Sequence, residues 1–376
     1  MSLKVGILTG SFRAFSEALI LAIDARGGGE VMAEFCRVGG IVAEAETPYR
    51  VVIDRISHDI SFYREYLKHA ALQGAYVINN PFRMQPDKFA GYTLCGKLGI
   101  RIPPTVALPP KAYRPGVQPE DLTNLVYPLP WEAIVEHVGF PAIMRSASGF
   151  GPAHLVNDFA EMMRVYDASG TETMILQRFV VPQRYLRCFV FGQRFARPVV
   201  FSLARQAYVT GEELPPDLAE EVTTAAIRLS RALGYDMNIV EFSVQDDVPY
   251  LTDFVNLVSD LSPVVLPESL FEWAVDRMAE SVIDYARSGA RTPLGTSTLP
   301  EGSGDVAAQE TSKKPSRKKT TTRKRTTKAA SASSDTPPEG SGDAAAQEAS
   351  KKSSRKKTTT RKRTTTRTRG SKSSKA

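Results

Sequence analysis

The chain has 376 residues, a net charge of +7 at neutral pH and three cysteines. No apolar run reaches the roughly 18 residues of a membrane-spanning helix, and the first residues lack the apolar stretch of a secretory signal peptide, so neither is expected. Cys36, Cys95 and Cys188 have neither pairing nor metal-ligand spacing, which argues against a disulfide framework and a zinc site. Free cysteines of this kind are typical of the reducing cytoplasm.

The charge is divided unevenly along the chain. Residues 291–376 carry 22 Lys or Arg and 7 Asp or Glu, a net +15, which leaves −8 for residues 1–290 out of the total of +7. The C-terminal part consists almost entirely of Lys, Arg, Ser, Thr, Ala, Gly and Pro, and such a composition cannot bury enough apolar surface to fold. The sequence therefore predicts an acidic folded body followed by a disordered basic tail.

The first 80 residues alternate between strand and helix patterns. Short apolar runs predict strands over Lys4–Leu8, Val31–Cys36, Tyr49–Ile53 and Tyr76–Ile78. Helical spacing of apolar residues predicts helices over Ala14–Ala25 and Ser61–Gln73. This order predicts a small parallel or mixed sheet with helices on its faces.

The rest of the body has an α+β pattern. Helices are predicted over Asp87–Leu98, Trp131–Val138, Phe159–Tyr166, Leu218–Leu233 and Glu268–Ala286. An extended, proline-rich connection is expected from Leu108 to Pro130. The apolar segments Met174–Val180, Tyr185–Phe191 and Arg194–Ser202 predict three strands of one antiparallel sheet.

The most informative stretch is a predicted hairpin near the end of the body. Met237–Asn256 indicates two strands around the polar turn Gln245–Asp247, because apolar and polar residues alternate along both arms. Glu241 lies on the first arm, and Asp253 and Asn256 lie at the end of the second. Two carboxylates and an amide oxygen suit Mg²⁺, which takes oxygen ligands and is usually shared with nucleotide phosphates. The alternative is that these residues face solvent on an edge strand.

Basic residues and a glycine loop precede this hairpin. Lys88 begins a predicted helix, and Arg145 ends a predicted strand just before the loop that contains Gly149 and Gly151. Cations and loop N–H groups can hold phosphates while carboxylates hold their metal. Arg187 lies in an apolar strand and needs a buried anion or a carboxylate partner. The plain alternatives are an ordinary turn, a solvated lysine and a structural ion pair.

The order of these features resembles the ATP-grasp superfamily, which includes ribosomal-protein glutamate ligases and glutathione synthetases. The resemblance covers nearly the whole body and rests on Tyr49–His58, Tyr63–Lys68, Gly74–Phe82, Asp87–Phe89, Gly139–Ala142, Gly234–Glu241 and Pro249–Asn256. It implies an ATP-grasp fold of mixed α/β and α+β class. A pre-ATP-grasp domain would span 1–80, an ATP-grasp domain of two α+β lobes 81–290, and the tail 291–376.

The resemblance also implies a site for ATP with Mg²⁺, or with Mn²⁺, between the two lobes. The expected nucleotide contacts are Lys88, Arg145, Ser148, Gly149, Gly151, Gln177, Phe179 and Val180. The expected metal ligands are Glu241, Asp253 and Asn256. Arg145 and Arg187 fall on catalytic positions, where Arg187 helps to hold the transferred phosphate or the substrate. Ligases of this superfamily join a carboxylate to an amine or a thiol through an acyl phosphate.

The phosphate loop departs from the family pattern. Relatives have Lys-Pro and a run of glycines ending in Trp-Lys, where residues 145–153 of this chain read RSASGFGPA. Arg145 keeps the charge, but its planar fork places its donors differently from a lysine. After Asn256, relatives show Pro-Ala-Pro-Asp where this chain has Leu257–Asp260. Two functions remain open: an ATP-dependent ligase of small-molecule or peptide substrates, and a catalytically degenerate ATP-grasp module that serves as a nucleic-acid-associated binding or structural protein.

The tail contains an internal repeat. Residues 300–327 recur at 338–365 with three differences, and each copy carries a dense cationic block without aromatic residues, Arg317–Arg325 and Arg355–Arg363. Such blocks predict that residues 313–376 bind nucleic acid phosphates without sequence preference. The expected location is the bacterial cytoplasm, in association with the nucleoid. Attachment to an acidic membrane and a merely solubilising arm are the alternatives.

Overall fold

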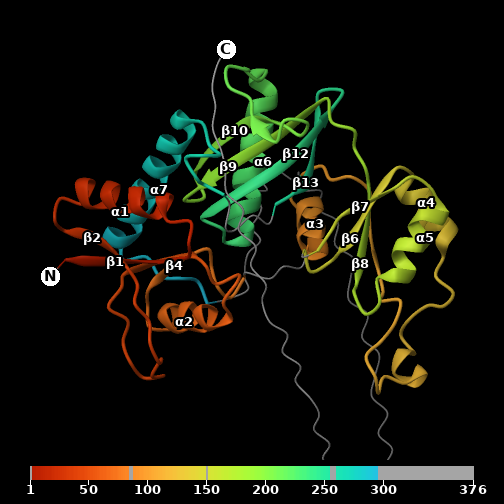
Figure 1. Cartoon of the computed structure of the whole chain (residues 1–376), viewed down its shortest axis with the longest axis horizontal. Helices are drawn as coiled ribbons and strands as arrows, with labels where there is room; N and C mark the ends of the chain where they lie inside the picture. Colours follow the sequence, from red (N-terminus) through yellow and green to blue (C-terminus); the bar gives the residue numbers. More distant parts are fainter. Residues whose placement is uncertain (1, 84–87, 150, 255–259, 295–376) are drawn as a thin grey trace, which may run out of the picture. The chain divides into compact units, whose positions relative to one another are not determined.

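The computed structural model describes residues 2–83, 88–149, 151–254 and 260–294 (Figure 1). All of them belong to one unit, Met1–Asp305, while a second unit, Val306–Ala376, lies outside the described residues. The predicted repeats and the predicted nucleic-acid-binding segment therefore lie outside them as well. Within the described ranges, no helix combines the length and the apolar character needed to cross a membrane.

The N-terminal sheet is wholly parallel and has the strand order β2-β1-β3-β4. Its strands are β1 (Leu3–Thr9), β2 (Val31–Phe35), β3 (Val51–Arg55) and β4 (Tyr76–Ile78), and its helices are α1 (Ala14–Arg26) and α2 (Ser61–Leu72). The prediction of a parallel or mixed sheet is confirmed in its parallel form. Strand β2 is added at one edge of β1, and β3 is then added at its opposite edge. The strand order therefore reverses between β1 and β3.

Both faces of this sheet are apolar. Val5 and Ile7 belong to a core cluster with α1 and α7 (Glu268–Ser288), whereas Leu8 and Val52 belong to a cluster with α2. Successive side chains of a strand point to opposite faces, so one apolar run supplies both clusters. Helix α7 also contacts β9 (Arg184–Phe191) and thereby joins this sheet to the next one.

The central sheet has the order β11-β10-β9-β12-β13. Its further strands are β10 (Phe195–Ser202), β11 (Ala207–Tyr208), β12 (Met237–Gln245) and β13 (Val248–Asp253). Helix α6 (Pro216–Leu233) packs on it, and α3 (Lys88–Lys97) contacts α6 (Figure 1). The predicted hairpin is confirmed: Asp246 and Asp247 have φ of 53° and 58°, the positive values that two-residue hairpin turns require.

The third sheet has the order β5-β8-β6-β7 and antiparallel pairing. Its strands are β5 (Thr105–Leu108), β6 (Ala142–Ser146), β7 (His154–Val156) and β8 (Met174–Arg178), with α4 (Trp131–Val138), α5 (Phe159–Ala168) and the short 3-10 helix η1 (Pro119–Leu122). The prediction that the strand beginning at Met174 shares a sheet with β9 and β10 was wrong, because β8 pairs with β5 and β6. Strand β5 was missed because it has only four residues and lies in a proline-rich stretch, where an edge strand is tolerated.

A buried carboxylate fastens β4 and α7 to the start of β12. The hydroxyls of Tyr76 and Tyr285 donate to Asp236 at 3.0 and 2.8 Å, and the Gln193 amide donates at 2.9 Å. The two tyrosine rings stack with their centroids 4.2 Å apart. Burial raises the pKa of Asp236 to about 6, although these donors work in the opposite direction.

Asp236 should therefore make stability depend on pH. Its pKa is higher in the folded chain than in the unfolded one, so its contribution is largest at low pH and falls as pH rises through about 6. From about pH 5 to about pH 7 we expect the free energy of unfolding to lose about 1–2 kcal/mol from this group. Urea denaturation at both pH values gives the free energy of unfolding of the wild type and of Asp236→Asn. The loss is the change with pH in the difference between these two free energies. A difference that is the same at both pH values would contradict it.

Candidate functional site

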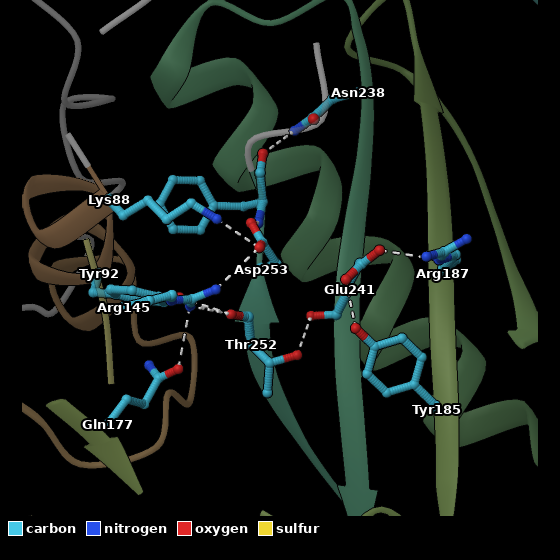
Figure 2. Close-up of polar contacts among 11 residues, drawn as sticks. Lys88, Tyr92, Arg145, Gln177, Tyr185, Arg187, Asn238, Glu241, Thr252 and Asp253 are labelled. Carbon is cyan, nitrogen blue, oxygen red and sulfur yellow. Dashed lines mark hydrogen bonds and ion pairs between the residues drawn. The ribbon is translucent and has the colours of Figure 1, made fainter. Parts of the chain in front are cut away.

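Two cations from different elements converge on the carboxylate of Asp253, the last residue of β13 (Figure 2). The Nζ of Lys88, at the start of α3, lies 2.6 Å from Asp253 Oδ2, and the Nη1 of Arg145, from β6, lies 3.2 Å from the same oxygen. The side chains are 7% exposed for Lys88, 15% for Arg145 and 26% for Asp253. The cluster is therefore largely withdrawn from water, and its charges depend on one another.

The guanidinium of Arg145 has several further acceptors. Its Nη2 donates to the Tyr92 hydroxyl, to the Thr252 carbonyl at 3.0 Å and to Gln177 Oε1 at 3.4 Å. The Tyr92 hydroxyl in turn donates to the Thr252 carbonyl at 2.7 Å. These contacts use the forked donors of arginine, which a lysine does not have. The departure from lysine at this position thus ties β6 to α3 and β13.

The second carboxylate, Glu241, lies opposite Asp253 in the β12–β13 ladder, at a bulge. Arg187 Nε donates to Glu241 Oε1 at 3.0 Å, and the Tyr185 hydroxyl donates to Oε2 (Figure 2). Burial is the largest influence on the pKa of Arg187 and lowers it, but the charge of Glu241 together with Tyr208 and Tyr185 raises the pKa overall. The Arg187 Cζ lies 3.8 Å from the Phe201 ring centroid. The structure thus gives Arg187 a carboxylate partner, Glu241, in an ion pair.

The loop after β6 lies against Lys88. The Lys88 amide donates to the Ala147 carbonyl at 3.3 Å, and the hydroxyls of Ser146 and Ser148 are 2.8 Å apart. Gly149 has φ of +79°, and a Cβ there would come within 2.9 Å of Lys88 Cε. Glycine supplies both the positive φ and the close approach. Gly149 therefore lies against Lys88, and Ser148 precedes it in the same loop.

The remaining predicted residues are only partly brought together. Gln177 is buried and links Arg145 to the Thr105 hydroxyl, to which its Nε2 donates at 2.8 Å. The Phe179 amide donates to the Pro141 carbonyl at 2.9 Å, and Val180 is buried. Gly151 has φ of +92° and open space around it. Asn256, the third predicted metal ligand, lies outside the described residues.

Sequence reasoning missed three residues of this site. Tyr92 lies on α3 one turn after Lys88, and residues four apart share a helix face. Tyr185 precedes Arg187 by two positions on β9, so both side chains point to one face of the sheet. Thr252 contributes its carbonyl and carried no signal. The first two could have been found from the periodicity of their elements.

Helix α3 reaches the hairpin through a glycine. A Cβ on Gly91 would lie 2.1 Å from the ring of Phe254, the residue after Asp253, so we expect Gly91→Ala to displace the ring and to lower the free energy of unfolding by about 1–3 kcal/mol. Gly96 on the same helix has nothing within 4 Å of a Cβ, and Gly96→Ala should raise stability by about 0.5–1 kcal/mol. Urea denaturation measures both, and equal effects of the two substitutions would contradict this packing.

Comparison with solved structures finds the same overall fold in other proteins. A RimK domain protein, ATP-grasp, from Sphaerobacter thermophilus superposes with a TM-score of 0.53 at 20% identity, covering 76% of this chain and 99% of that one. The D-alanine–D-alanine ligase of Bacillus anthracis complexed with ATP gives 0.52 at 14% identity, covering 77% and 98%. The corresponding ligase of Coxiella burnetii gives 0.52 at 12% identity, covering 76% and 95%. The chain has the ATP-grasp fold. Comparisons with known protein families and with curated protein sequences found no match.

The fold implied by the sequence resemblance is thereby confirmed. Within this ATP-grasp fold, Lys88 and Arg145 meet Asp253 where the third sheet, α3 and the central sheet approach one another. The described residues contain no group of three or more Asp, Glu, His or Cys arranged to hold a metal. Glu241 and Asp253 are the two predicted carboxylate ligands that lie within those residues.

Proposed function

We propose that this protein binds ATP with Mg²⁺ and uses it to ligate a carboxylate to an amine. The observation that carries the proposal is the convergence of Lys88 and Arg145 on Asp253, with Glu241 opposite it on the neighbouring strand. Cations next to carboxylates in a largely buried site form the charge pattern that a metal–phosphate complex needs. The fold that the chain shares with a solved D-alanine–D-alanine ligase complexed with ATP supports the same reaction class.

The donor set fits MgATP. Lys88 and Arg145 would hold phosphate oxygens, and Glu241 and Asp253 would hold the metal. Each carboxylate already has a cationic partner, so a bound anion and a bound metal would exchange partners with these pairs and leave no charge buried alone. When bound, ATP supplies the phosphoryl group that activates a carboxylate as an acyl phosphate.

Arg187 would stabilise the charge of the transferred phosphoryl group. The Phe201 ring covers its guanidinium plane and would hold it in place when Glu241 binds the metal. A donor oriented in this way before the reaction needs no reorganisation when charge develops, which is the main source of electrostatic catalysis. Tyr185 would hold Glu241 in its orientation by donating to the second carboxylate oxygen.

Isothermal titration of ATP into the full-length protein, with and without Mg²⁺, tests this proposal. We expect saturable, Mg²⁺-dependent binding that is lost in Asp253→Ala. No heat from the wild type would contradict it. If binding then appeared in Arg145→Lys, the altered phosphate loop would be responsible for the loss, and the alternative of a degenerate ATP-grasp module would be favoured.

The composition of the tail favours a second, separate function, which is binding to nucleic acid. Residues 291–376 carry a net +15, and the acidic body would not bind a polyanion by itself. We expect the full chain to bind DNA of any sequence, with an affinity that falls by about 10³–10⁵ between about 50 and 200 mM salt if six or more phosphates are contacted. Fluorescence anisotropy of a labelled duplex measures this. Thr292 is buried against β4, so the truncated variant should lack residues 295–376 only. If this variant bound equally well, the tail would be ruled out as the binding segment.

A further inference from the structure

The side chain of Lys88 is enclosed by the loop that follows β6. This side chain is 7% exposed, and the Lys88 amide donates to the Ala147 carbonyl of that loop at 3.3 Å. A Cβ on Gly149 would lie 2.9 Å from Lys88 Cε and 3.6 Å from its Cδ and Cγ, so the loop backbone passes directly over the aliphatic stem. The ammonium therefore cannot turn out into water while the loop keeps this position.

The enclosed ammonium depends on one acceptor. Lys88 Nζ lies 2.6 Å from Asp253 Oδ2, and within the part of the chain that the structure describes it has no second acceptor (Figure 2). Asp253 is held from its other side as well, because its Oδ1 accepts from the Phe254 amide at 2.7 Å. A buried cation that loses its carboxylate is left without compensation, which is strongly unfavourable.

Arg145 depends far less on the same carboxylate. Its Nη1 lies 3.2 Å from Asp253 Oδ2, but its Nη2 has the three further acceptors described above, all of them uncharged. If Asp253 turned to another cation, Arg145 would keep those acceptors and Lys88 would keep none. Of the two cations at Asp253, Lys88 is therefore the one that a competing metal would leave unpaired.

The charge of the whole site has the same effect. Three cations face two carboxylates, which gives a net +1: Lys88, Arg145 and Arg187 against Asp253 and Glu241. A divalent metal alone would raise this to +3 in a largely buried site and would also take Asp253 from Lys88. A triphosphate brings several negative charges and new oxygen acceptors for the ammonium. The metal and the phosphates thus offset each other's electrostatic penalty.

We propose that Lys88 makes metal binding at Asp253 conditional on a phosphate-bearing ligand. A divalent metal takes the carboxylate only when a phosphate oxygen replaces Asp253 as the acceptor of the Lys88 ammonium. This inference rests on the proposed function, because it places phosphate and metal in that same site. Metal and nucleotide then raise each other's affinity by the same factor, since the coupling between two ligands is reciprocal. The site accepts the metal–nucleotide complex and discriminates against free Mg²⁺ and metal-free ATP.

Two titrations of the full-length protein measure this coupling. Electron paramagnetic resonance follows Mn²⁺ alone, because the signal of free Mn²⁺ falls when the ion binds, and calorimetry follows a non-hydrolysable ATP analogue with and without Mn²⁺. In the wild type we expect Mn²⁺ to tighten binding of the analogue about 100-fold or more. In Lys88→Met, which fills the enclosed space without the charge, Mn²⁺ alone should bind about tenfold more tightly than in the wild type, and the coupling factor should fall about tenfold.

Arg145→Gln is the matched control, because it removes one positive charge from the same oxygen but not the enclosed one. Its gain in Mn²⁺ affinity should be about fivefold smaller than that of Lys88→Met. Equal gains would mean that Mn²⁺ responds to charge alone, and an unchanged Mn²⁺ affinity in Lys88→Met would remove the competition for Asp253. Either result overturns the proposal. Lys88→Gln is the second variant, needed if Lys88→Met does not fold, and the absence of a gain there would overturn it equally.

The two proposals fail separately in these titrations. If the analogue binds the wild type neither with nor without Mn²⁺, ATP binding is refuted, whereas a gain in Mn²⁺ affinity in Lys88→Met would still show that Lys88 competes for Asp253. If the analogue binds the wild type with Mn²⁺ but Lys88→Met leaves the Mn²⁺ affinity and the coupling factor unchanged, ATP binding stands and the role of Lys88 is refuted.

Discussion

Replacing Asp253 with alanine is expected to lower the free energy of unfolding by about 3 kcal/mol and to abolish Mg²⁺-dependent ATP binding. The carboxylate is shared by Lys88 and Arg145, whose side chains are 7% and 15% exposed. Removing one partner of a buried ion pair leaves a desolvated charge without compensation, which costs about 3–5 kcal/mol. The low end applies because Asp253 itself is about a quarter exposed.

The matched control is Asp167→Ala. Asp167 pairs with Lys111 at 2.5 Å, but the two side chains are 53% and 45% exposed. A pair in water contributes little, so this variant should lose less than about 1 kcal/mol. Urea denaturation measures both variants. If they lost the same stability, the cluster around Asp253 would behave as a surface ion pair, and its role in retaining two buried cations would have to be abandoned.

The second large effect is expected on turnover. Arg187→Met should reduce phosphoryl transfer about 100- to 1000-fold, equivalent to about 2.7–4 kcal/mol of transition-state stabilisation, while the affinity for MgATP changes only severalfold. Methionine keeps much of the apolar contact with Phe201 and removes the charge that faces Glu241. Arg187→Lys should retain part of the rate, because the charge remains but the fork is lost.

Arg197→Met on the neighbouring strand β10 controls for the loss of an arginine from this sheet. Arg197 lies near Trp273 and donates to the Ser269 carbonyl at 3.4 Å, away from Glu241. Its turnover should equal that of the wild type. Single-turnover release of phosphate from labelled ATP measures the rates. If Arg187→Met lowered the affinity for MgATP but left the rate of phosphoryl transfer unchanged, Arg187 would be assigned to nucleotide binding and not to transfer.

The sequence predicted the hairpin well because its determinants are local. Alternation with period two assigns each side chain of β12 and β13 to a face, and the two-residue turn at Asp246 and Asp247 then fixes the register. That register alone would pair Glu241 with Thr252, and the bulge between Glu241 and Phe242, which the sequence did not indicate, shifts the pairing to Asp253. The need of Arg187 for a partner was predictable from its apolar strand, since a buried guanidinium without an anion is costly.

The partners themselves were not predictable, because they are set by tertiary contacts. Lys88 and Asp253 are 165 residues apart in the chain, and Arg145 and Asp253 are 108 apart. Strand β8 has the same apolar character as β9, and nothing in its own residues selects β5 and β6 as neighbours. Periodicity indicates which face of an element is buried but not which element covers it.

The sharing of Asp253 by two cations has a consequence for how fast ATP arrives. With Arg187 and Glu241 included, three cations face two carboxylates, so the site projects the field of only one net charge into solvent. A charged ligand therefore gains little from long-range attraction during its approach. Association of MgATP should then be nearly independent of ionic strength, whereas association of nucleic acid with the basic tail should slow steeply as salt is added. One stopped-flow salt series would thus separate the two binding events kinetically within a single chain.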